Sequence, residues 1–362
     1  MRQYLELLRT VLGQGDPQYN ERTGQLMLVR SRGQIDYDLR EGFPMVTTKA
    51  SAPLRWVGEE MFWMLRGERN AKTLYDKDGV DIWNRNAYDH YLKRKGLSTK
   101  ILKNTPEWES SFLEYQQRMK SDPNWNMEDS DLGPVYGWQW RHWTGKDGKE
   151  VDQVAKTIKE LKERPGSRYQ IWTAWNPAEN GDMALAPCHS WVQFTVTRNR
   201  DLDLHMFQRS TDVFLGDPFN NAQYGLVGHM VAQETGLKPR IFTHSYGNVH
   251  IYAGVSPRSN FLANETNLAE LQRRVKGATQ KGDYLEIRDW YLRSSPDESL
   301  GNERKDHVPF VLEQLSKEPQ PLPRLQLANM PFFELIERPA REVMKLEGYA
   351  PLKWDSKATM AA

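Results

Sequence analysis

The residue best suited to do chemistry is Cys188, the only cysteine among 362 residues. A single cysteine is often a small, inert, buried hydrophobe. This one stands in Ala-Leu-Ala-Pro-Cys-His at 184–189 and precedes Gln-Arg-Ser-Thr-Asp at 208–212. The attacking form of cysteine is the thiolate, which a nearby positive charge favours. Arg209 is expected to supply that charge, so we predict that Cys188 is a nucleophile.

Two strands are expected to bring these residues together. Residues 190–197 and 201–207 both have the composition of strands, and the polar residues 198–200 lie between them. An antiparallel hairpin centred near residue 199 pairs position 188 or 189 with position 209 or 210. The pattern therefore places Cys188 close to Arg209.

A cysteine–histidine hydrolase is the first mechanism that Cys188 and His189 suggest. Adjacent residues on an extended chain point to opposite faces, so His189 is poorly placed to take the proton of Cys188. The sequence also offers no second acyl-transfer motif that would supply an orienting acid or an oxyanion hole. This mechanism is therefore not favoured.

Composition narrows the class of protein. The chain has 49 Lys and Arg against 48 Asp and Glu, a net charge of +1, which argues against a surface that coats nucleic acid. One cysteine excludes a disulfide framework and a cysteine-rich zinc site, so no metal is expected and a reducing compartment fits. The N-terminus has the pattern of an amphipathic helix, and no apolar run approaches the ~20 residues of a membrane span. We expect a cytoplasmic protein that acts on a small molecule, without a nucleic-acid or membrane partner.

The secondary-structure signals give an α+β pattern that is not a repeated βαβ series. Helices are expected at about 2–13, 53–66, 152–164, 218–235 and 306–317, and strands at about 26–38, 169–175, 190–197, 201–209, 241–254 and 322–327. Asp152 is a candidate N-cap, and Gly236 a candidate C-terminal stop. Residues 88–130 and 255–305 are expected to be helical insertions within a single domain that spans 1–362.

Read together, many short stretches resemble the thymidylate synthase family, which includes pyrimidine nucleotide hydroxymethylases. The matching stretches are Asn-Glu-Arg-Thr-Gly (20–24), Gly-Phe-Pro-Met-Val-Thr-Thr-Lys (42–49), Glu60 with Trp63 and Gly67, Ile-Trp (82–83), Asp-Leu-Gly-Pro-Val-Tyr-Gly-Trp-Gln-Trp-Arg (131–141), Ser-Arg-Tyr (167–169), Ala-Pro-Cys-His (186–189), residues 208–222 and His-Ile-Tyr (250–252). One such stretch would be weak, but the ordered set is specific. The match runs from residue 1 to about 351.

The resemblance implies a homodimer built on a large bent mixed sheet packed with helices, with a face of the sheet as the dimer interface. It also implies a pyrimidine nucleoside monophosphate substrate, 5,10-methylenetetrahydrofolate as cosubstrate and no metal. Carbon 5 of uracil is a poor nucleophile, and a thiolate added at carbon 6 activates it; Cys188 is that thiolate. Glu60 is the acid/base group, and its apolar neighbours at 61–63 would raise its pKa. Tyr136 assists removal of the carbon 5 proton.

The remaining site residues are likewise implied by the resemblance. The catalytic group is completed by His189, Arg209 and Asp212. The nucleotide is bound by Arg22, Gln208, Arg209, Ser210, Asn220, His250 and Tyr252, with Arg168 entering from a second copy of the chain. The folate is bound by Lys49, Ile82, Trp83, Leu185, Asp212, Gly216, Phe219 and Ala361, the last in a C-terminal tail, 357–362, that closes over it. Asn220 points to uracil, because an amide accepts from N3–H and donates to O4, whereas family members that act on cytosine carry Asp here.

Several departures from the family pattern lie on the folate side. They are Ala50, Ser51, Ala52, Asn86 and Asp217. In addition, Tyr169 stands where the family has a phosphate-binding arginine, and Asn248 stands where it has an aspartate. Small or polar groups on the folate side would admit water to the transferred carbon. We therefore favour a deoxyuridylate hydroxymethylase that makes 5-hydroxymethyl-dUMP over a thymidylate synthase that makes dTMP and dihydrofolate.

Two further alternatives stay open. One is a relative that uses ribonucleotides. The other is a non-catalytic nucleotide or RNA binder, which the presence of Cys188, Glu60, Tyr136 and Arg209 and the near-neutral charge disfavour.

Overall fold

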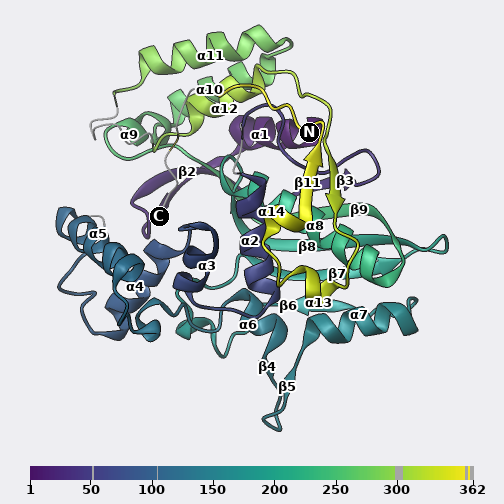
Figure 1. Ribbon diagram of the computed structural model, residues 1–362. Helices are drawn as coiled ribbons and strands as arrows, with labels where there is room; N and C mark the ends of the chain where they lie inside the picture. The colour runs from purple at the N-terminus through teal and green to yellow at the C-terminus, as the bar shows by residue number, and fades with distance from the viewer. Residues whose placement is uncertain (51–52, 104, 298–304, 355–357, 359–362) are drawn as a thin grey trace.

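A mixed β-sheet forms the centre of the computed structural model, which describes residues 1–50, 53–103, 105–297, 305–354 and 358 (Figure 1). In the described residues seven strands join in the order β1-β2-β9-β8-β7-β6, with β3 also paired to β9. Their bounds are β1 Asp16–Asn20, β2 Gln25–Arg30, β3 Gly33–Asp38, β6 Ile171–Thr173, β7 His189–Val196, β8 Asp201–Asp212 and β9 Lys238–Tyr252. β8 and β9 are parallel, and the other pairs are antiparallel. The expected α+β fold with a mixed sheet is confirmed.

The strand expected at 26–38 is two strands. β2 pairs with residues 249–252 of β9, and β3 pairs with residues 241–246 of the same strand. Ser31 and Arg32 interrupt the ladder between them. The run of apolar and polar residues predicted the extended conformation. It did not predict the break, because β2 and β3 pair with the same long strand, β9.

The predicted helices are present, and each end lies within two residues of the expected one. They are α1 Arg2–Gln14, α2 Leu54–Leu65, α7 Gln153–Glu163, α8 Gly216–Thr235 and α12 Val308–Leu315. Asp152 caps α7 by accepting a hydrogen bond from Ala155 N at 2.9 Å. Gly236 ends α8 in the left-handed conformation, with φ 65°. α8 is the central buried helix, and it packs against β8, β9 and α2.

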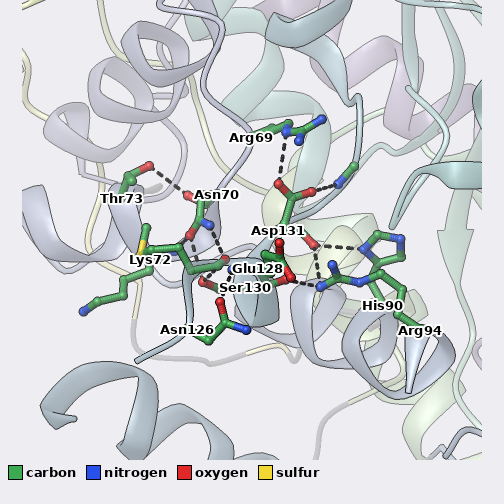
Figure 2. Close-up of polar contacts among 12 residues, drawn as sticks. Arg69, Asn70, Lys72, Thr73, His90, Arg94, Asn126, Glu128, Ser130 and Asp131 are labelled. Carbon is green, nitrogen blue, oxygen red and sulfur yellow. Dashed lines mark hydrogen bonds and ion pairs between the residues drawn. The ribbon is translucent and has the colours of Figure 1, made fainter. Parts of the chain in front are cut away.

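The described residues of the segment 88–130 lie largely in helices. They are α4 (Asn84–Arg94), α5 (Pro106–Ser121) and the 3-10 helix η1 (Met127–Ser130). These helices have a small core of their own, which we call the aromatic cluster: Tyr88, Leu92, Trp108, Phe112, Tyr115 and Met119. Asn70 precedes α3 (Ala71–Asp78) and is hydrogen-bonded to Met127 and Ser130 of η1. Asp131, which follows η1, forms an ion pair with Arg69 (Figure 2).

The segment expected at 255–305 is also helical where it is described; residues 298–304 lie outside the described part. It holds α9 (Arg258–Ala263), α10 (Glu265–Gly277) and α11 (Lys281–Ser294), which pack beside α1 and α12 at the top of Figure 1. The other elements are α6 Tyr136–Arg141, β4 Trp143–Thr144, β5 Glu150–Val151, η2 Asn180–Asp182, β10 Arg324–Leu327, α13 Phe332–Leu335, α14 Ala340–Val343 and β11 Met344–Glu347. Within the described ranges, no helix combines the length and the apolar character needed to cross a bilayer.

Candidate active site

Cys188 lies just before β7 and is held by two neighbouring elements. Its carbonyl accepts a hydrogen bond from Arg209 N at 2.8 Å, and its own N–H donates to the Tyr136 hydroxyl at 2.8 Å. His189 is paired with Gln208 in the β7–β8 ladder. The predicted hairpin is present, but at this position the register differs by one residue from the prediction, because a β-bulge lies between His189 and Trp191. The thiol is half-buried.

The Arg209 guanidinium orders the loop that leads to the cysteine. Nε donates to Pro187 O at 2.9 Å and Nη2 donates to Ala186 O at 2.7 Å, while the group lies 5.7 Å from the Trp175 ring centre. Arg209 therefore fixes the backbone on the N-terminal side of Cys188 and brings a positive charge to it.

Tyr136 adopts a backbone conformation that non-glycine residues rarely take, with φ 22°. It is buried, and burial, with the neighbouring Cys188, raises the pKa of its hydroxyl well above the ordinary value. The next residue, Gly137, lies so close to Met64 O on α2 that a side chain there would clash. This close approach of α6 to α2 places the neutral Tyr136 hydroxyl between Cys188 and the helix that carries Glu60.

Glu60 is buried on α2 and accepts two hydrogen bonds. Trp83 Nε1 donates to Oε1 at 2.7 Å, and Gln223 Nε2 donates to Oε2 at 2.6 Å. Burial raises the pKa of Glu60 to about 7, although both hydrogen bonds act in the opposite direction. A carboxyl group with this pKa can both give and take a proton at neutral pH, as a general acid/base must.

Asn220 is joined to Glu60 through a chain of amides. Its Nδ2 donates to Gln223 Oε1 at 3.3 Å, and its Oδ1 accepts from Gln208 Nε2 at 3.1 Å. We call Glu60, Gln208, Asn220 and Gln223 the Asn220 cluster. Gln223 is missing from the sequence prediction; its signal is a polar residue one helical turn after Asn220 on an otherwise apolar helix face.

His189 lies beside this cluster, with its ring packed edge-on against Tyr136 and Tyr224. Burial lowers the pKa of His189 to about 4, and a hydrogen bond with Asn220 opposes this only in part. The imidazole is therefore neutral at physiological pH. It neighbours Asn220 rather than serving as a charged partner of the cysteine.

The expected nucleotide residues on β8 and β9 lie next to one another. Ser210 is paired with Asn248, and Asn248 Oδ1 lies 2.9 Å from His250 Nδ1. The His250 and Tyr252 rings meet edge to face, 5.0 Å apart. Burial lowers the pKa of His250 to about 4 and raises that of Tyr252 to about 12, and the charge of Arg22 is close enough to act on both.

Arg168 lies apart from these residues, in the loop before β6. Its carbonyl accepts from Gln193 Nε2 at 3.3 Å, and its neighbour Tyr169 is 84% exposed. Among the residues that the structure describes, no hydrogen bond joins the Arg168 side chain to the Cys188 site.

The expected folate residues divide into two groups. Trp83 is buried beside Glu60, and Phe219 is half-buried in the first turn of α8, which begins at Gly216. Leu185 is half-buried, and Ile82 is 39% exposed. Lys49 is different, because its Nζ donates to Phe214 O at 2.6 Å and lies 3.5 Å from the ring centre of that residue. Burial lowers the pKa of Lys49 to about 7. Ala361 lies outside the described residues.

Asp212 offers an acceptor to a ligand. Oδ1 accepts from the N–H groups of Phe214 and Leu215 at 2.9 and 3.3 Å, whereas buried Oδ2 has no hydrogen-bond partner in the described part of the chain and lies 3.7 Å from His307 Nδ1. Burial acts to raise the pKa of Asp212, but His307 and the backbone hydrogen bond outweigh it, so the pKa is lowered. An ionised carboxylate accepts hydrogen bonds, and an acceptor of this kind suits the N–H donors of a pterin ring.

Asp217 does not lie on the folate side, which corrects the expectation. It is fully buried, and its carboxyl accepts from Tyr246 Oη at 2.8 Å and from Asn221 Nδ2 at 2.6 Å. Position 217 is the second residue of α8 and faces β9, so the substitution is part of the core. Of the other departures, Ala50 is exposed and Asn86 is half-buried on α4, while Ser51 and Ala52 lie outside the described residues.

The site thus joins a half-buried cysteine, a neutral tyrosine hydroxyl, a buried glutamate and a side-chain amide. These groups are chemically suited to nucleophilic attack and proton transfer. The family model described as "Thymidylate synthase" matches residues 2–362. The chain belongs to the thymidylate synthase family and is a one-carbon transferase with that family's fold.

Three relatives named thymidylate synthase are similar to this chain. The protein of Mesoplasma florum is 41% identical over 252 residues, which are 70% of this chain and 81% of the relative. The Mycoplasma genitalium protein is 41% identical over 254 residues, with the same coverage. The Listeria monocytogenes protein is 39% identical over 263 residues, covering 70% of this chain and 82% of the relative. The family uses methylenetetrahydrofolate as cosubstrate. In the described part of the chain, no group of three or more His, Cys, Asp and Glu side chains is placed to hold a metal ion.

Proposed function

We propose that this chain transfers a one-carbon unit from 5,10-methylenetetrahydrofolate to C5 of dUMP, and that the products are dTMP and dihydrofolate. The observation that carries the proposal is the continuous chain Glu60–Gln223–Asn220, which lies beside the cysteine that Tyr136 and Arg209 hold. This chain of hydrogen bonds connects Glu60, whose pKa is about 7, to the Asn220 amide that would contact the base. The relatives at 39–41% identity that are named thymidylate synthase support the methyl product.

Each side chain has a defined task in this reaction. The Cys188 thiolate forms a bond to C6 of uracil, and the C5–C6 electron pair moves toward O4, so C5 becomes the nucleophile that bonds to the donated carbon. Glu60 supplies and recovers protons on the O4 side. Tyr136 assists loss of the C5 proton, and tetrahydrofolate then leaves the transferred carbon, which becomes an exocyclic methylene on C5. A hydride from tetrahydrofolate adds to this methylene to give the methyl group and oxidises the folate to dihydrofolate, while expulsion of the thiolate from C6 restores the ring double bond.

Uracil is the base that the geometry favours. Gln208 donates to Asn220 Oδ1, which fixes that atom as the oxygen, and the second lone pair of Oδ1 is left to accept N3–H. Asn220 Nδ2 then faces O4, an acceptor. Cytosine presents the reverse pattern at both positions, so it would require the amide to turn over and lose the bond from Gln208.

The hydroxymethyl product remains a second candidate. The observation in its favour is Asn84, the first residue of α4 after Trp83, which is 1% exposed and whose two amide atoms have no hydrogen-bond partner among the described residues. Asn86 follows on the same helix. Polar groups beside Trp83 suit an ordered water. The main support for water addition is weaker than expected from the sequence, because Asp217 lies in the core and not beside the folate.

Product analysis separates the candidates. Incubation with dUMP and methylenetetrahydrofolate should give an absorbance rise from dihydrofolate, together with one dTMP for each dihydrofolate. A product one oxygen heavier than dTMP, with tetrahydrofolate and no absorbance rise, would establish the hydroxymethylase instead. A binder without turnover would give neither product, and it would not form a covalent complex with 5-fluoro-dUMP and the folate.

We propose a cytoplasmic homodimer in which Arg168 of each chain completes the site of the other. The position of Arg168 beside the exposed Tyr169, away from its own chain's Cys188, supports this arrangement, and the single free thiol suits a reducing compartment. The exposed polar side chains of β3 and β9, such as Asp36 and Thr243, offer a face for pairing. Mixing Arg168→Ala and Cys188→Ser chains should restore one working site in a mixed dimer. A monomer in sedimentation would exclude the proposal.

A further inference from the structure

Four buried polar residues continue the Asn220 cluster into the core. We call Asp217, Asn221, His244 and Tyr246 the inner polar cluster; each is 3% exposed or less. Two come from α8 and two from β9, where they replace the apolar contacts expected between a helix and a sheet. Polar groups at such depth are stable only when every donor meets an acceptor. Their hydrogen atoms can therefore be assigned by elimination.

The first assignment concerns Gln208 and His244. Gln208 Nε2 lies 3.1 Å from the Ser210 carbonyl, which can only accept, so this atom is the amide nitrogen. Its other end, Oε1, lies 2.9 Å from His244 Nε2. Because Oε1 can only accept, His244 must carry a hydrogen on Nε2. His244 is thus the donor that holds the Gln208 amide in its observed orientation.

The second assignment concerns His244 and Asp217. His244 Nδ1 lies 2.7 Å from one end of the Asn221 amide, and the other end lies 2.6 Å from Asp217 Oδ2. If the oxygen of Asn221 faces His244, then Nδ1 must also carry a hydrogen and the imidazole is charged. If the nitrogen faces His244, then the oxygen meets Asp217, which must be protonated. Either way, the pair formed by His244 and Asp217 keeps one proton.

Burial favours the uncharged arrangement. It raises the pKa of Asp217 to about 7 and lowers that of His244 well below its ordinary value. This arrangement turns the Asn221 amide over, so that its oxygen, and not the Nδ2 assigned above, lies 2.6 Å from Asp217 Oδ2. The other titratable groups that act on this pair are Tyr4, Tyr37, Tyr246 and Asp212 around Asp217, and His189 and His205 around His244. Among these groups, none is a cation that would stabilise an ionised Asp217 at neutral pH.

We propose that the inner polar cluster is a positioning device for base recognition, in which the retained proton keeps His244 Nε2–H directed at Gln208. Gln208 then donates to Asn220 Oδ1, and Asn220 presents an acceptor to N3–H and a donor to O4. The inference rests on the proposed function, since it assumes that Asn220 reads a uracil nucleotide. His244 and Asp217 are positioning residues that act through Gln208, and Asn220 alone touches the base.

The consequence is that loss of the His244 donor frees two amides to turn over. Gln208 could then present its nitrogen to the core and its oxygen to Asn220, which would turn over in response. The reversed Asn220 offers a donor to N3 and an acceptor to the exocyclic amine, as cytosine requires. Base preference should therefore depend on residues that lie two side chains away from the base.

The test is binding of dUMP and dCMP to the full-length protein, measured by calorimetry so that turnover is not needed. His244→Phe keeps an aromatic ring beside Tyr246, whose ring centroid lies 4.0 Å from that of His244, but it removes both nitrogens. It should raise the Kd of dUMP about tenfold and lower the preference for dUMP over dCMP about tenfold, the effect of one lost hydrogen bond. Asp217→Asn imitates the protonated acid and should keep the preference within about twofold.

Two comparisons distinguish positioning from simple support of the core. Tyr246→Phe removes the donor to Asp217 but leaves the shared proton, so it should lower stability and leave base preference unchanged. Between pH 6 and pH 8.5 the preference of the unaltered protein should fall as Asp217 loses its proton, while that of Asp217→Asn should change less at the same pH values.

The outcomes that overturn the proposal are equally specific. A folded His244→Phe protein with unchanged preference would overturn it, and so would equal weakening of both nucleotides. If His244→Phe does not fold, identical pH dependence in the unaltered protein and in Asp217→Asn would overturn it. An unaltered protein that binds neither nucleotide would instead contradict the proposed function itself.

Discussion

The Asn220 cluster and the aromatic cluster of α4 and α5 are built in opposite ways. In the first, amides and a carboxyl group are buried, and each is held in one orientation by directional bonds such as that from Gln223 to Glu60. In the second, rings such as Tyr88 and Trp108 pack 5.3 Å apart. Its polar contacts, such as Arg85 with Glu109, are at the surface. Directional bonds determine which ligand fits, whereas ring packing mainly determines how stable the segment is.

This difference predicts that substitutions in the two regions fall into separate classes. Changes around Asn220 and Cys188 should alter activity or selectivity with little effect on unfolding. Changes in the aromatic cluster should alter unfolding with little effect on the turnover of folded protein. Substitutions in either region test this difference, and the largest effect is expected at Cys188.

Cys188→Ser should lower turnover more than about 1000-fold, because a hydroxyl lacks the acidity and nucleophilicity of a thiol. The half-buried side chain changes little in volume, so the unfolding midpoint should stay within about 2 °C. Release of tritium from C5-labelled dUMP measures turnover without regard to the product. Binding of dUMP should remain within about tenfold. More than a few per cent of residual activity would show that sulfur is not the nucleophile.

Trp108→Ala should lower the free energy of unfolding by about 3–5 kcal/mol, since it empties the centre of the aromatic cluster. Trp108 is 1% exposed, and its Nε1 also donates to Asp89 at 2.9 Å. We expect kcat to stay within about twofold. Urea unfolding at 25 °C measures the loss, and Leu113→Ala, on the same helix but 60% exposed, is the matched control with a change of at most about 0.5 kcal/mol.

The same experiment tests the single-domain proposal. If the segment 84–130 belongs to one folding unit with the sheet, unfolding of the Trp108→Ala protein should remain a single transition when followed by far-UV and near-UV signals. Two transitions would mean that the aromatic cluster unfolds by itself.

Much of this organisation could be predicted from the sequence, because it follows from local patterns. The hairpin that brings Cys188 to Arg209 is encoded in two short strands and a polar turn. Helix α7 was defined by an apolar stripe and the Asp152 cap. In both cases the residues that determine the structure lie within a few positions of one another.

The inner polar cluster could not be predicted in the same way. Asp217 and Asn221 are spaced one helical turn apart, and His244 and Tyr246 alternate on a strand, but nothing local shows that the two pairs face each other. Asp217 alone therefore looked like a polar substitution near the folate. The contact of Lys49 with Phe214 could not be predicted for the same reason, since it joins residues far apart in the chain.

Glu60→Gln should lower kcat about 100-fold, as expected for loss of a general acid/base. The unaltered enzyme should lose activity as the pH rises through about 7 if protonated Glu60 is needed, because burial raises the pKa to that value. The amide that this substitution introduces does not titrate, so the residual activity of E60Q should lack this step. A tritium-release profile from pH 5.5 to 8.5 measures both effects.

Glu60→Gln should lower activity, but it should not lower stability at high pH. A carboxyl group whose folded pKa is raised contributes stability that is fully present below its unfolded pKa of 4.5 and lost as the pH rises through about 7. At pH 8 E60Q should therefore be at least as stable as the unaltered protein, although the new amide replaces an acceptor that Trp83 or Gln223 uses. A large loss of stability at pH 8 would show that the ionised carboxylate supports the fold.

Asn70→Ala is expected to have the smallest effect, and it tests the boundary between the two regions. Asn70 caps α3 by accepting from Lys72 N at 3.0 Å, accepts from Ser130 Oγ at 2.8 Å and donates to Met127 O at 2.6 Å (Figure 2). Loss of an N-cap typically costs about 1 kcal/mol. Asn70→Asp, which keeps the cap but loses the donor to Met127, is the matched control and should recover part of that stability.

The activity of Asn70→Ala tests whether Asn70 also helps to position Tyr136. Residues 127–131 lead directly into the loop that ends at Tyr136, and Asp131 fixes its start through a hydrogen bond to Gly133 N at 2.7 Å. If that hydrogen bond and the close contact of Gly137 with α2 hold Tyr136 independently of Asn70, kcat should stay within about twofold. A fall in kcat of more than about tenfold, at unchanged dUMP affinity, would mean that the anchor of the aromatic cluster also positions Tyr136. The two regions would then be coupled through this loop, and insertions in the segment 84–130 would be expected to tune catalysis as well as stability.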